Sequence, residues 1–231
     1  AIRSMANAVA EAKTQNLIHE AVLFIVQNSN QVEIPSDSIE RILASKEINF
    51  VLKQNTTNIG FGRAHNQIIK NELSDFSLIL NPDTLLHKDS LSIGLNFLKT
   101  HPSVSVIGPK GFDPDCSYLS LSKSYPSVTS LFFRGLKSLT NIKLFDELTK
   151  RYQCAHLEKA KKPQRVEITS GCMMLCRTDH LKQIKGFNER FFLYFEDFDL
   201  CLRIKKIGDI YFLPNMTLIH RGGNTARKGL K

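Results

Sequence analysis

Short apolar runs recur along the sequence, and polar segments separate them. The runs are rich in β-branched and other large apolar residues, so we expect each of them to form a strand. They cover residues 21–26, 48–52, 76–80, 104–108, 168–175 and 210–213. Between the early runs, apolar residues repeat at helical spacing in segments 36–45 and 88–99. Strands that alternate with helices form βαβ units, so the pattern predicts an α/β fold with a mainly parallel sheet flanked by helices.

The length of the chain fits one domain. With 231 residues, of which 42% are hydrophobic, the chain can bury one ordinary α/β core, so we expect a single domain over residues 1–231. Its longest purely apolar run, residues 21–26, is far shorter than the roughly 20 residues that a membrane-spanning helix needs. The pattern loosens over residues 116–165, which predicts an insertion with a helix near 131–139 and a mobile basic loop near 156–165.

The net charge of +9 points to an anionic partner. The partner could be a nucleotide, a nucleic acid or an anionic lipid surface. An equally good interpretation is that the basic residues lie on solvated loops and bind no partner. The sequence contains no recognisable nucleic-acid-binding module, so we expect no nucleic-acid partner. Two basic clusters carry much of the charge; they consist of Lys159, Lys161, Lys162 and Arg165, and of Arg221, Arg227, Lys228 and Lys231.

The cysteines favour a reducing compartment. Their number, five, is odd, and none of them forms a Cys-x-x-Cys pair, so a reduced cytoplasmic protein fits best. Cys172, Cys176 and His180 lie close in sequence, but their spacing matches none of the usual structural zinc patterns. We therefore interpret the two cysteines as small hydrophobic residues of a strand.

Asn81-Pro82-Asp83 directly follows the predicted strand 76–80. A carboxylate at the end of a buried strand can face a ligand, and oxygen ligands are what Mg²⁺ and Mn²⁺ prefer beside a diphosphate. The same three residue types also favour turns, so a plain turn is the alternative.

Three acidic residues follow a run of large apolar residues in the segment 191–199. Glu196, Asp197 and Asp199 suit the first turn of a helix, where acids interact favourably with the helix dipole, and Asp199 can pair with Arg203 one turn later. An acid beside an aromatic wall can also be a general base, because a partly dry site raises its pKa. Both interpretations can hold together.

Two weaker signals lie elsewhere. His220 follows the last apolar run and is interpreted either as a structural residue or as a metal ligand. The turn around Asn58 and Gly60 precedes a helix-like segment, so its backbone N–H groups could approach a ligand closely.

Taken in order, these segments resemble the inverting glycosyltransferases of family 2, particularly the bacterial rhamnosyltransferase-like branch. The resemblance runs through most of the chain, over residues 58–66, 78–86, 170–177, 186–203 and His220. It implies a GT-A fold, in which about residues 1–110 bind a nucleotide sugar and about residues 111–231 form the acceptor side.

The resemblance also assigns roles to individual residues. Asp83 corresponds to the metal-binding acid of the DXD-like motif, with Asn81 in place of the first acid, and His220 corresponds to a late metal ligand. Asp197 corresponds to the catalytic base of the Glu-Asp motif and lies beside Glu196. The residues implied in nucleotide-sugar binding are Gln27, Asn28, Ser29, Asn58, Gly60, Asn66 and Asn81.

The sequence departs from the family pattern at two places. Gln27 replaces an acid that reads the nucleobase, although an amide can also hydrogen-bond a base edge. The family's first strand has no counterpart in residues 1–15, so we expect that strand to be missing from this chain. These departures motivate a rival interpretation, a catalytically silent nucleotide- or glycan-binding relative.

The resemblance implies an inverting, Mg²⁺- or Mn²⁺-dependent transfer from a nucleotide-sugar donor. The expected donor is dTDP-rhamnose, with a UDP-hexose or a UDP-N-acetylhexosamine as alternatives. The expected acceptor is a glycan, free or linked to a polyprenyl diphosphate, in bacterial surface-polysaccharide synthesis. Such an acceptor would bring a cytoplasmic protein to the inner face of the plasma membrane, where its basic clusters would meet an anionic surface.

Overall fold

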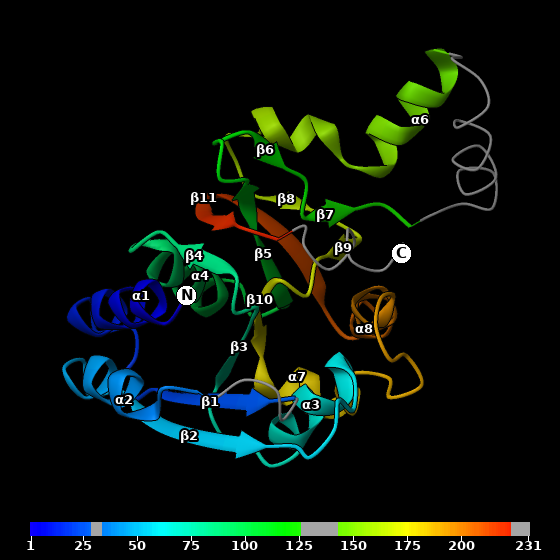
Figure 1. Cartoon of the computed structure of the whole chain (residues 1–231). Helices are drawn as coiled ribbons and strands as arrows, with labels where there is room; N and C mark the ends of the chain where they lie inside the picture. Colours follow the sequence, from blue (N-terminus) through cyan, green and yellow to red (C-terminus); the bar gives the residue numbers. More distant parts are fainter. Residues whose placement is uncertain (29–33, 126–142, 223–231) are drawn as a thin grey trace.

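The computed structural model describes residues 1–28, 34–125 and 143–222, and its elements are shown in Figure 1. The helices are α1 (Ile2–Thr14), α2 (Ser36–Ala44), α3 (Phe61–Ile69), α4 (Ser90–Thr100), α6 (Lys143–Tyr152), α7 (Thr178–Gln183), α8 (Glu196–Ile204) and the 3-10 helix η1 (Ala155–Lys159). The strands are β1 (Val22–Gln27), β2 (Asn49–Gln54), β3 (Phe76–Leu80), β4 (Thr84–Leu86), β5 (Val104–Phe112), β6 (Tyr118–Leu119), β7 (Ser122–Lys123), β8 (Gln164–Arg165), β9 (Ile168–Thr169), β10 (Met173–Arg177) and β11 (Asp209–His220).

A seven-stranded sheet forms the centre of the fold. Its main path is β3-β10-β5-β11-β4, with β6 on β5 and β8 on β11. Strand β5 pairs with β11 in parallel, whereas β10 is antiparallel to both β3 and β5, and β4 is antiparallel to β11. Strands β3, β5 and β11 therefore share one direction along the main path.

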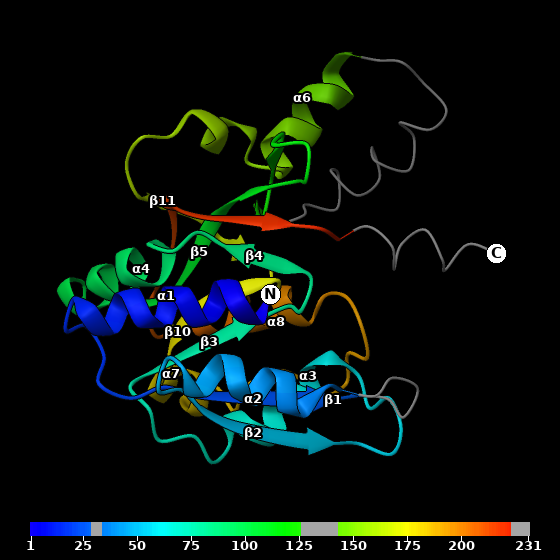
Figure 2. The ribbon, with the colours of Figure 1, turned by 60° about the vertical axis from the view of Figure 1, so that its left-hand side comes forward.

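Strands β1 and β2 form a separate parallel pair. The turned view in Figure 2 shows this pair beside α2, below the central sheet. Within the described residues, neither β1 nor β2 exchanges ladder hydrogen bonds with the seven-stranded sheet.

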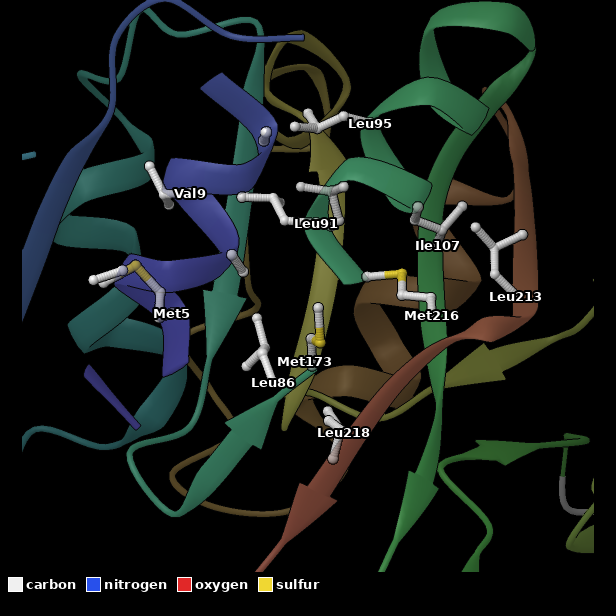
Figure 3. Packing of buried hydrophobic residues seen from close by; sticks show 14 of the residues in the cluster. Met5, Val9, Leu86, Leu91, Leu95, Ile107, Met173, Leu213, Met216 and Leu218 are labelled. Carbon is white, nitrogen blue, oxygen red and sulfur yellow. The ribbon is translucent and has the colours of Figure 1, made fainter. Parts of the chain in front are cut away.

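The sheet separates two hydrophobic clusters. Successive residues of β10 point to opposite faces, as a strand requires: Met173 and Leu175 enter one cluster, Met174 and Cys176 the other. Helices α1 and α4 cover the first face, part of which is seen in Figure 3, and α7 and α8 cover the second, while α2 packs against α1 and β2. The prediction of an α/β fold with helices flanking a sheet is confirmed.

The predicted strands are present, but three of them differ in extent. Strand β5, predicted over 104–108, continues to Phe112. Residues 168–175 divide into β9 and β10, because a turn from Ser170 to Cys172 interrupts the ladder. The last strand extends to His220 after a register shift between Leu213 and Thr217, and β4, which the sequence did not predict, pairs with its end. These changes bring His220 to the site described below.

The expected loop near 156–165 contains regular structure. It holds η1 and β8, the side chain of Leu157 is fully buried, and Lys110 donates a hydrogen bond to the carbonyl of Glu158. Arg165 pairs with Asp209 at 2.5 Å. The helix expected near 131–139 lies outside the described residues.

The five cysteines are free thiols, and all except Cys116 are buried. Cys172 and Cys176 enter different hydrophobic clusters, and His180 is hydrogen-bonded to Ser105 at 2.7 Å, so the structure does not gather them for zinc. No helix in the described part of the chain is both long and apolar enough to cross a bilayer.

Candidate active site

Asp83 and His220 meet where β4 pairs with the end of β11. The register places His220 opposite Thr84, the residue after Asp83. His220 Nε2 lies 3.2 Å from Asp83 Oδ1, and the two side chains are 20% and 44% exposed. The backbone N–H of Arg221 also donates to the Asp83 carbonyl at 2.9 Å, which fixes the two segments together.

The Asn81-Pro82-Asp83 segment is both a turn and part of this site. The carbonyl of Asn81 accepts hydrogen bonds from the backbone N–H and the hydroxyl of Thr84, at 3.4 and 2.7 Å. The backbone N–H of Asn81 donates to the Cys172 carbonyl at 2.9 Å. The turn therefore directs Asp83 toward His220, so the two interpretations of this motif are compatible.

The geometry of the pair fits two ligands of one cation. His220 Nε2 is buried and, despite its closeness to Asp83, makes no hydrogen bond with good geometry to any described group. Two ligand atoms at right angles around a Mg²⁺ or Mn²⁺ ion, each about 2.1 Å from it, would be about 3 Å apart. A side chain on Gly222 would collide with the imidazole, since an added Cβ would lie 2.4 Å from His220 Cε1.

The protein supplies few ligands at this place. No group of three or more His, Cys, Asp or Glu residues that could hold a metal occurs in the described ranges. A magnesium site commonly uses one or two protein carboxylates and completes its shell with water and substrate phosphates. The Asp83 and His220 pair fits such an open site, and it does not resemble a closed structural metal site.

Asp197 lies in the first turn of α8, and two backbone groups hold its carboxylate. The N–H of Gly171 donates to Oδ2 at 3.2 Å, and the N–H of Phe198 donates to Oδ1 at 2.9 Å. Burial raises the pKa of Asp197, and these backbone hydrogen bonds and the charge of Lys123 partly oppose that rise. The carboxylate is therefore positioned and more basic than an exposed aspartate.

Glu196 begins α8 and is almost fully buried, with 7% of its surface exposed. Its Oε2 has no hydrogen-bond partner within the described part of the chain. Burial, followed by the neighbouring charge of Asp197, raises the pKa of Glu196. The other acid of the first turn, Asp199, pairs with Arg203 at 2.6 Å, as the helix interpretation predicts.

The turn before β10 joins the two acidic regions. Gly171 contacts Asp197, and the next residue, Cys172, accepts the hydrogen bond from Asn81. Burial raises the pKa of the Cys172 thiol to about 12, and the charges of Asp83 and Asp197 both add to that rise. Asp83 and Asp197 therefore both lie near this turn, Asp197 through its hydrogen bond with Gly171 and Asp83 through the Asn81–Cys172 contact two residues before it.

A cluster of amides lies at the carboxyl ends of β1 and β2. Asn28 Nδ2 donates to Asn58 Oδ1 at 2.9 Å and to the Gly60 carbonyl at 3.2 Å. Asn28 Oδ1 accepts from Asn55 Nδ2 and from the N–H of Ile59, at 3.2 and 3.1 Å. All the hydrogen-bonding capacity of the Asn28 side chain is used inside the protein, so Asn28 positions the turn before α3.

Gln27 is the last residue of β1, and its carbonyl accepts a hydrogen bond from the N–H of Asn55 at 2.9 Å. It is thus next to the amide cluster, at the strand end where ligands of α/β folds gather. Ser29 lies outside the described residues.

The side chain of Asn66 is used inside the protein. It is 1% exposed, and its side-chain amide makes two 2.8 Å hydrogen bonds with the backbone carbonyl and N–H of Phe187. It also donates to Glu189 at 3.0 Å. The sequence suggested a ligand contact for Asn66, whereas the structure uses it to attach α3 to the segment after α7.

Sequence reasoning missed the positioning roles of Gly171, Cys172 and Gly222. The first two lie inside a segment that was interpreted as one strand, and their contacts come from residues distant in the chain. Two signals could have suggested these roles: the dipeptide Ser170-Gly171, which is typical of turns, and a glycine two residues after the candidate ligand His220.

The structure has the fold of GT-A glycosyltransferases. It is similar to the crystal structure of TarS from S. aureus, with a TM-score of 0.59 and 18% identity, over 96% of this chain and 34% of that one. It is also similar to GalNAc-T7 with UDP, GalNAc and Mn²⁺, with a TM-score of 0.57 and 12% identity, over 90% of this chain and 38% of that one. At these identities the likeness establishes the fold alone.

The chain belongs to the glycosyltransferase-like family 2, whose family model matches residues 5–226. A similar curated protein is the N-acetylglucosaminyl-diphospho-decaprenol L-rhamnosyltransferase of Mycobacterium tuberculosis, which is 28% identical over 74% of this chain and 58% of that protein. Another is the rhamnosyltransferase WbbL of Escherichia coli, which is 27% identical over 63% of this chain and 52% of that protein. The chain thus spans little more than half the length of these relatives.

Proposed function

We propose that this chain transfers a sugar from a nucleotide diphosphate donor to an acceptor hydroxyl, with inversion at the anomeric carbon. The observation that carries the proposal is the arrangement around the turn 171–172. A partly buried carboxylate of raised pKa, Asp197, is hydrogen-bonded to this turn, and Asn81, two residues before Asp83 of a pair suited to a cation and a diphosphate, is hydrogen-bonded to the same turn.

Asp197 acts as the general base in this proposal. It takes the proton of the acceptor hydroxyl while the oxygen attacks the anomeric carbon from the face opposite the diphosphate. The new glycosidic bond forms as the bond from the anomeric carbon to the phosphate oxygen breaks, so the configuration inverts. Gly171 and Phe198 hold the carboxylate oriented for this step, and its raised pKa favours proton capture near neutral pH.

Asp83 and His220 would hold the divalent cation, Mg²⁺ or Mn²⁺. Bound there, the cation would neutralise charge on the leaving diphosphate. The support comes from this chain: the buried Nε2 without a hydrogen bond and its separation of 3.2 Å from the Asp83 oxygen. Gln27, Asn58 and Asn81 remain candidate contacts of the nucleotide sugar.

We propose dTDP-rhamnose as the donor, because two relatives are named as rhamnosyltransferases. A UDP-hexose and a UDP-N-acetylhexosamine are the alternatives. The M. tuberculosis relative is named for an acceptor carried on diphospho-decaprenol. We therefore propose a glycan or a polyprenyl-diphosphate-linked glycan as the acceptor, and a place at the cytoplasmic face of the membrane.

The test is a panel of nucleotide sugars with and without Mn²⁺. A ligand that binds only the native state raises the melting temperature, so the donor should be the sugar nucleotide that gives the largest rise. Transfer to a diphosphate-linked sugar acceptor is then followed, and NMR of the product reports the anomeric configuration. Binding without transfer to any acceptor would favour the catalytically silent relative, and retention of configuration would contradict the direct displacement.

A further inference from the structure

Four consecutive residues before α8 form an exposed apolar loop, which consists of Phe192, Leu193, Tyr194 and Phe195. Their exposed fractions are 57%, 45%, 56% and 56%. Single exposed hydrophobic residues are normal on soluble proteins, but a contiguous apolar patch marks an interaction site. In Figures 1 and 2 the chain that enters α8 runs at the periphery of the molecule.

The backbone of this loop is fixed although its side chains face outward. The N–H of Phe61 donates to the Phe192 carbonyl at 3.1 Å, and Gly60 packs so closely that an added Cβ would lie 2.7 Å from that oxygen. Tyr194 and Phe195 both have left-handed backbones, with φ of 68° and 67°. Such conformations are unfavourable for aromatic residues and persist only where neighbouring structure holds them. The exposure is therefore built into the fold.

We infer that the exposed apolar loop is a membrane-contact site that inserts into the interfacial region of an anionic bilayer. The inference rests on the proposed function, because a lipid-linked acceptor presents its sugar at that surface. The loop directly precedes Glu196 and Asp197, so its insertion would place the general base at the level of the lipid headgroups.

The chemistry of the loop favours a bilayer over a protein partner. Four half-exposed large side chains offer about 400 Å² of surface, whereas a stable protein interface buries about 800 Å² on each partner. Phenylalanine, leucine and tyrosine suit the boundary between lipid headgroups and acyl chains.

The charges around the loop permit contact with an anionic surface. Acids flank the loop on both sides, but two of them are paired with cations, Glu189 with Lys70 at 2.9 Å and Asp199 with Arg203 at 2.6 Å. The exposed Arg190, two residues before Phe192, can contact anionic headgroups beside the inserted side chains.

The experiment compares the full chain with its Leu193→Ser/Tyr194→Ser variant in co-sedimentation with vesicles. One vesicle type is phosphatidylcholine and the other contains phosphatidylglycerol. We expect wild-type protein to bind the anionic vesicles and the variant to bind about tenfold more weakly. Binding should persist in part at about 1 M NaCl, where the Debye length is about 3 Å and contacts of charged residues alone are screened.

The matched control is Leu73→Ser, because Leu73 is 89% exposed on the segment after α3 and lies outside the loop. Both variants should keep the wild-type melting temperature, turnover and KM with a water-soluble acceptor. The inference would be overturned if wild-type protein did not bind anionic vesicles. It would also be overturned if the Leu193→Ser/Tyr194→Ser variant bound them as tightly as wild type does. A raised KM for the soluble acceptor would also overturn it and assign the loop to the acceptor glycan. Loop-dependent vesicle binding without any sugar transfer would leave the membrane site standing and remove the proposed function.

Discussion

The backbone N–H of Gly171 and the carboxylate of Asp197 are hydrogen-bonded at 3.2 Å, although 26 residues separate them. This bond links the turn before β10 to the first turn of α8. It orients the acid while its burial raises the pKa. A positioned carboxylate of raised pKa has the properties of a general base, and the first prediction follows from it.

Asp197→Asn should lower turnover by about 10² to 10⁴-fold, because the amide cannot take the acceptor proton. The affinity for the donor, measured by thermal shift or calorimetry, should change little. Glu196→Gln should be milder. The matched control is Asp199→Asn in the same helical turn, which loses the pair with Arg203 but keeps most of the turnover. An Asp197→Asn variant that retains more than about a tenth of wild-type turnover would show that this residue is not the base.

Asp83→Ala should weaken the binding of the cation and of the nucleotide sugar together, because both would share one site. His220→Ala should act in the same direction but less strongly. Donor affinity is measured by calorimetry in Mn²⁺ and again in EDTA. A second histidine and aspartate pair, His87 and Asp89 at 3.4 Å, offers the control, and Asp89→Ala should leave both affinities unchanged. Equal donor affinity in Mn²⁺ and in EDTA would falsify the metal role.

The stability of the protein should depend on the charge of Asp197. Because burial raises its native pKa, the native state binds this proton more tightly than the unfolded state does. The stabilising contribution is present at low pH and is lost as the pH rises through the native pKa. Asp197→Asn should therefore raise the melting temperature relative to wild type at about pH 8, and by less at about pH 4.5. A difference in melting temperature that is independent of pH would contradict the raised pKa of Asp197.

Wild-type turnover should rise over the same pH range, since the base must be ionised.

Asn66→Ala should destabilise the fold and leave the KM for the donor unchanged. The substitution leaves the backbone carbonyl and N–H of Phe187 without their side-chain hydrogen-bond partner. Each buried polar group left unpaired lowers the free energy of unfolding by about 1–3 kcal/mol. Urea unfolding measures the loss, and Asn96→Ala on the exposed side of α4 is the control. A large rise in KM at nearly unchanged stability would instead support the ligand contact that the sequence suggested.

The sequence alone was sufficient to locate the helices and strands that have a strong local pattern of apolar residues. The apolar runs located β1, β2 and β3, and helical spacing located α2 and α4, each to within two residues at both ends, whereas β5 continues four residues beyond its predicted end. Residues 168–175 were interpreted as one strand because apolar residues lie on both sides, although Ser170-Gly171 is a dipeptide typical of turns. The hydrogen bond from Gly171 to Asp197 at this turn joins residues 26 positions apart, and the apolar pattern does not predict such a contact.

The sequence predicted the candidate site only in part, because some of its contacts join residues that are far apart in the chain. The family resemblance suggested that Asp83, Asp197 and His220 act together; the structure brings Asp83 to His220 and attaches Asp197 to the turn 171–172. Asn66 was assigned to the ligand through the family resemblance, because it lies in the matching segment 58–66. Its partner, Phe187, is 121 residues away, so only the folded chain shows that the amide is already used.

The isolation of the β1 and β2 pair has a consequence for the cooperativity of unfolding. These strands share ladder hydrogen bonds only with each other within the described residues, and Val22, Val51 and Leu52 are 46%, 44% and 39% exposed. Segments with few buried contacts open at lower free energy than the rest of a fold, and their amide protons exchange sooner. The amides of β1 and β2 should therefore exchange before those of β5 and β10, which lie inside the central sheet. The amide cluster at the carboxyl ends of the pair would loosen with it, so local opening and loss of the candidate nucleotide contacts would be a single event.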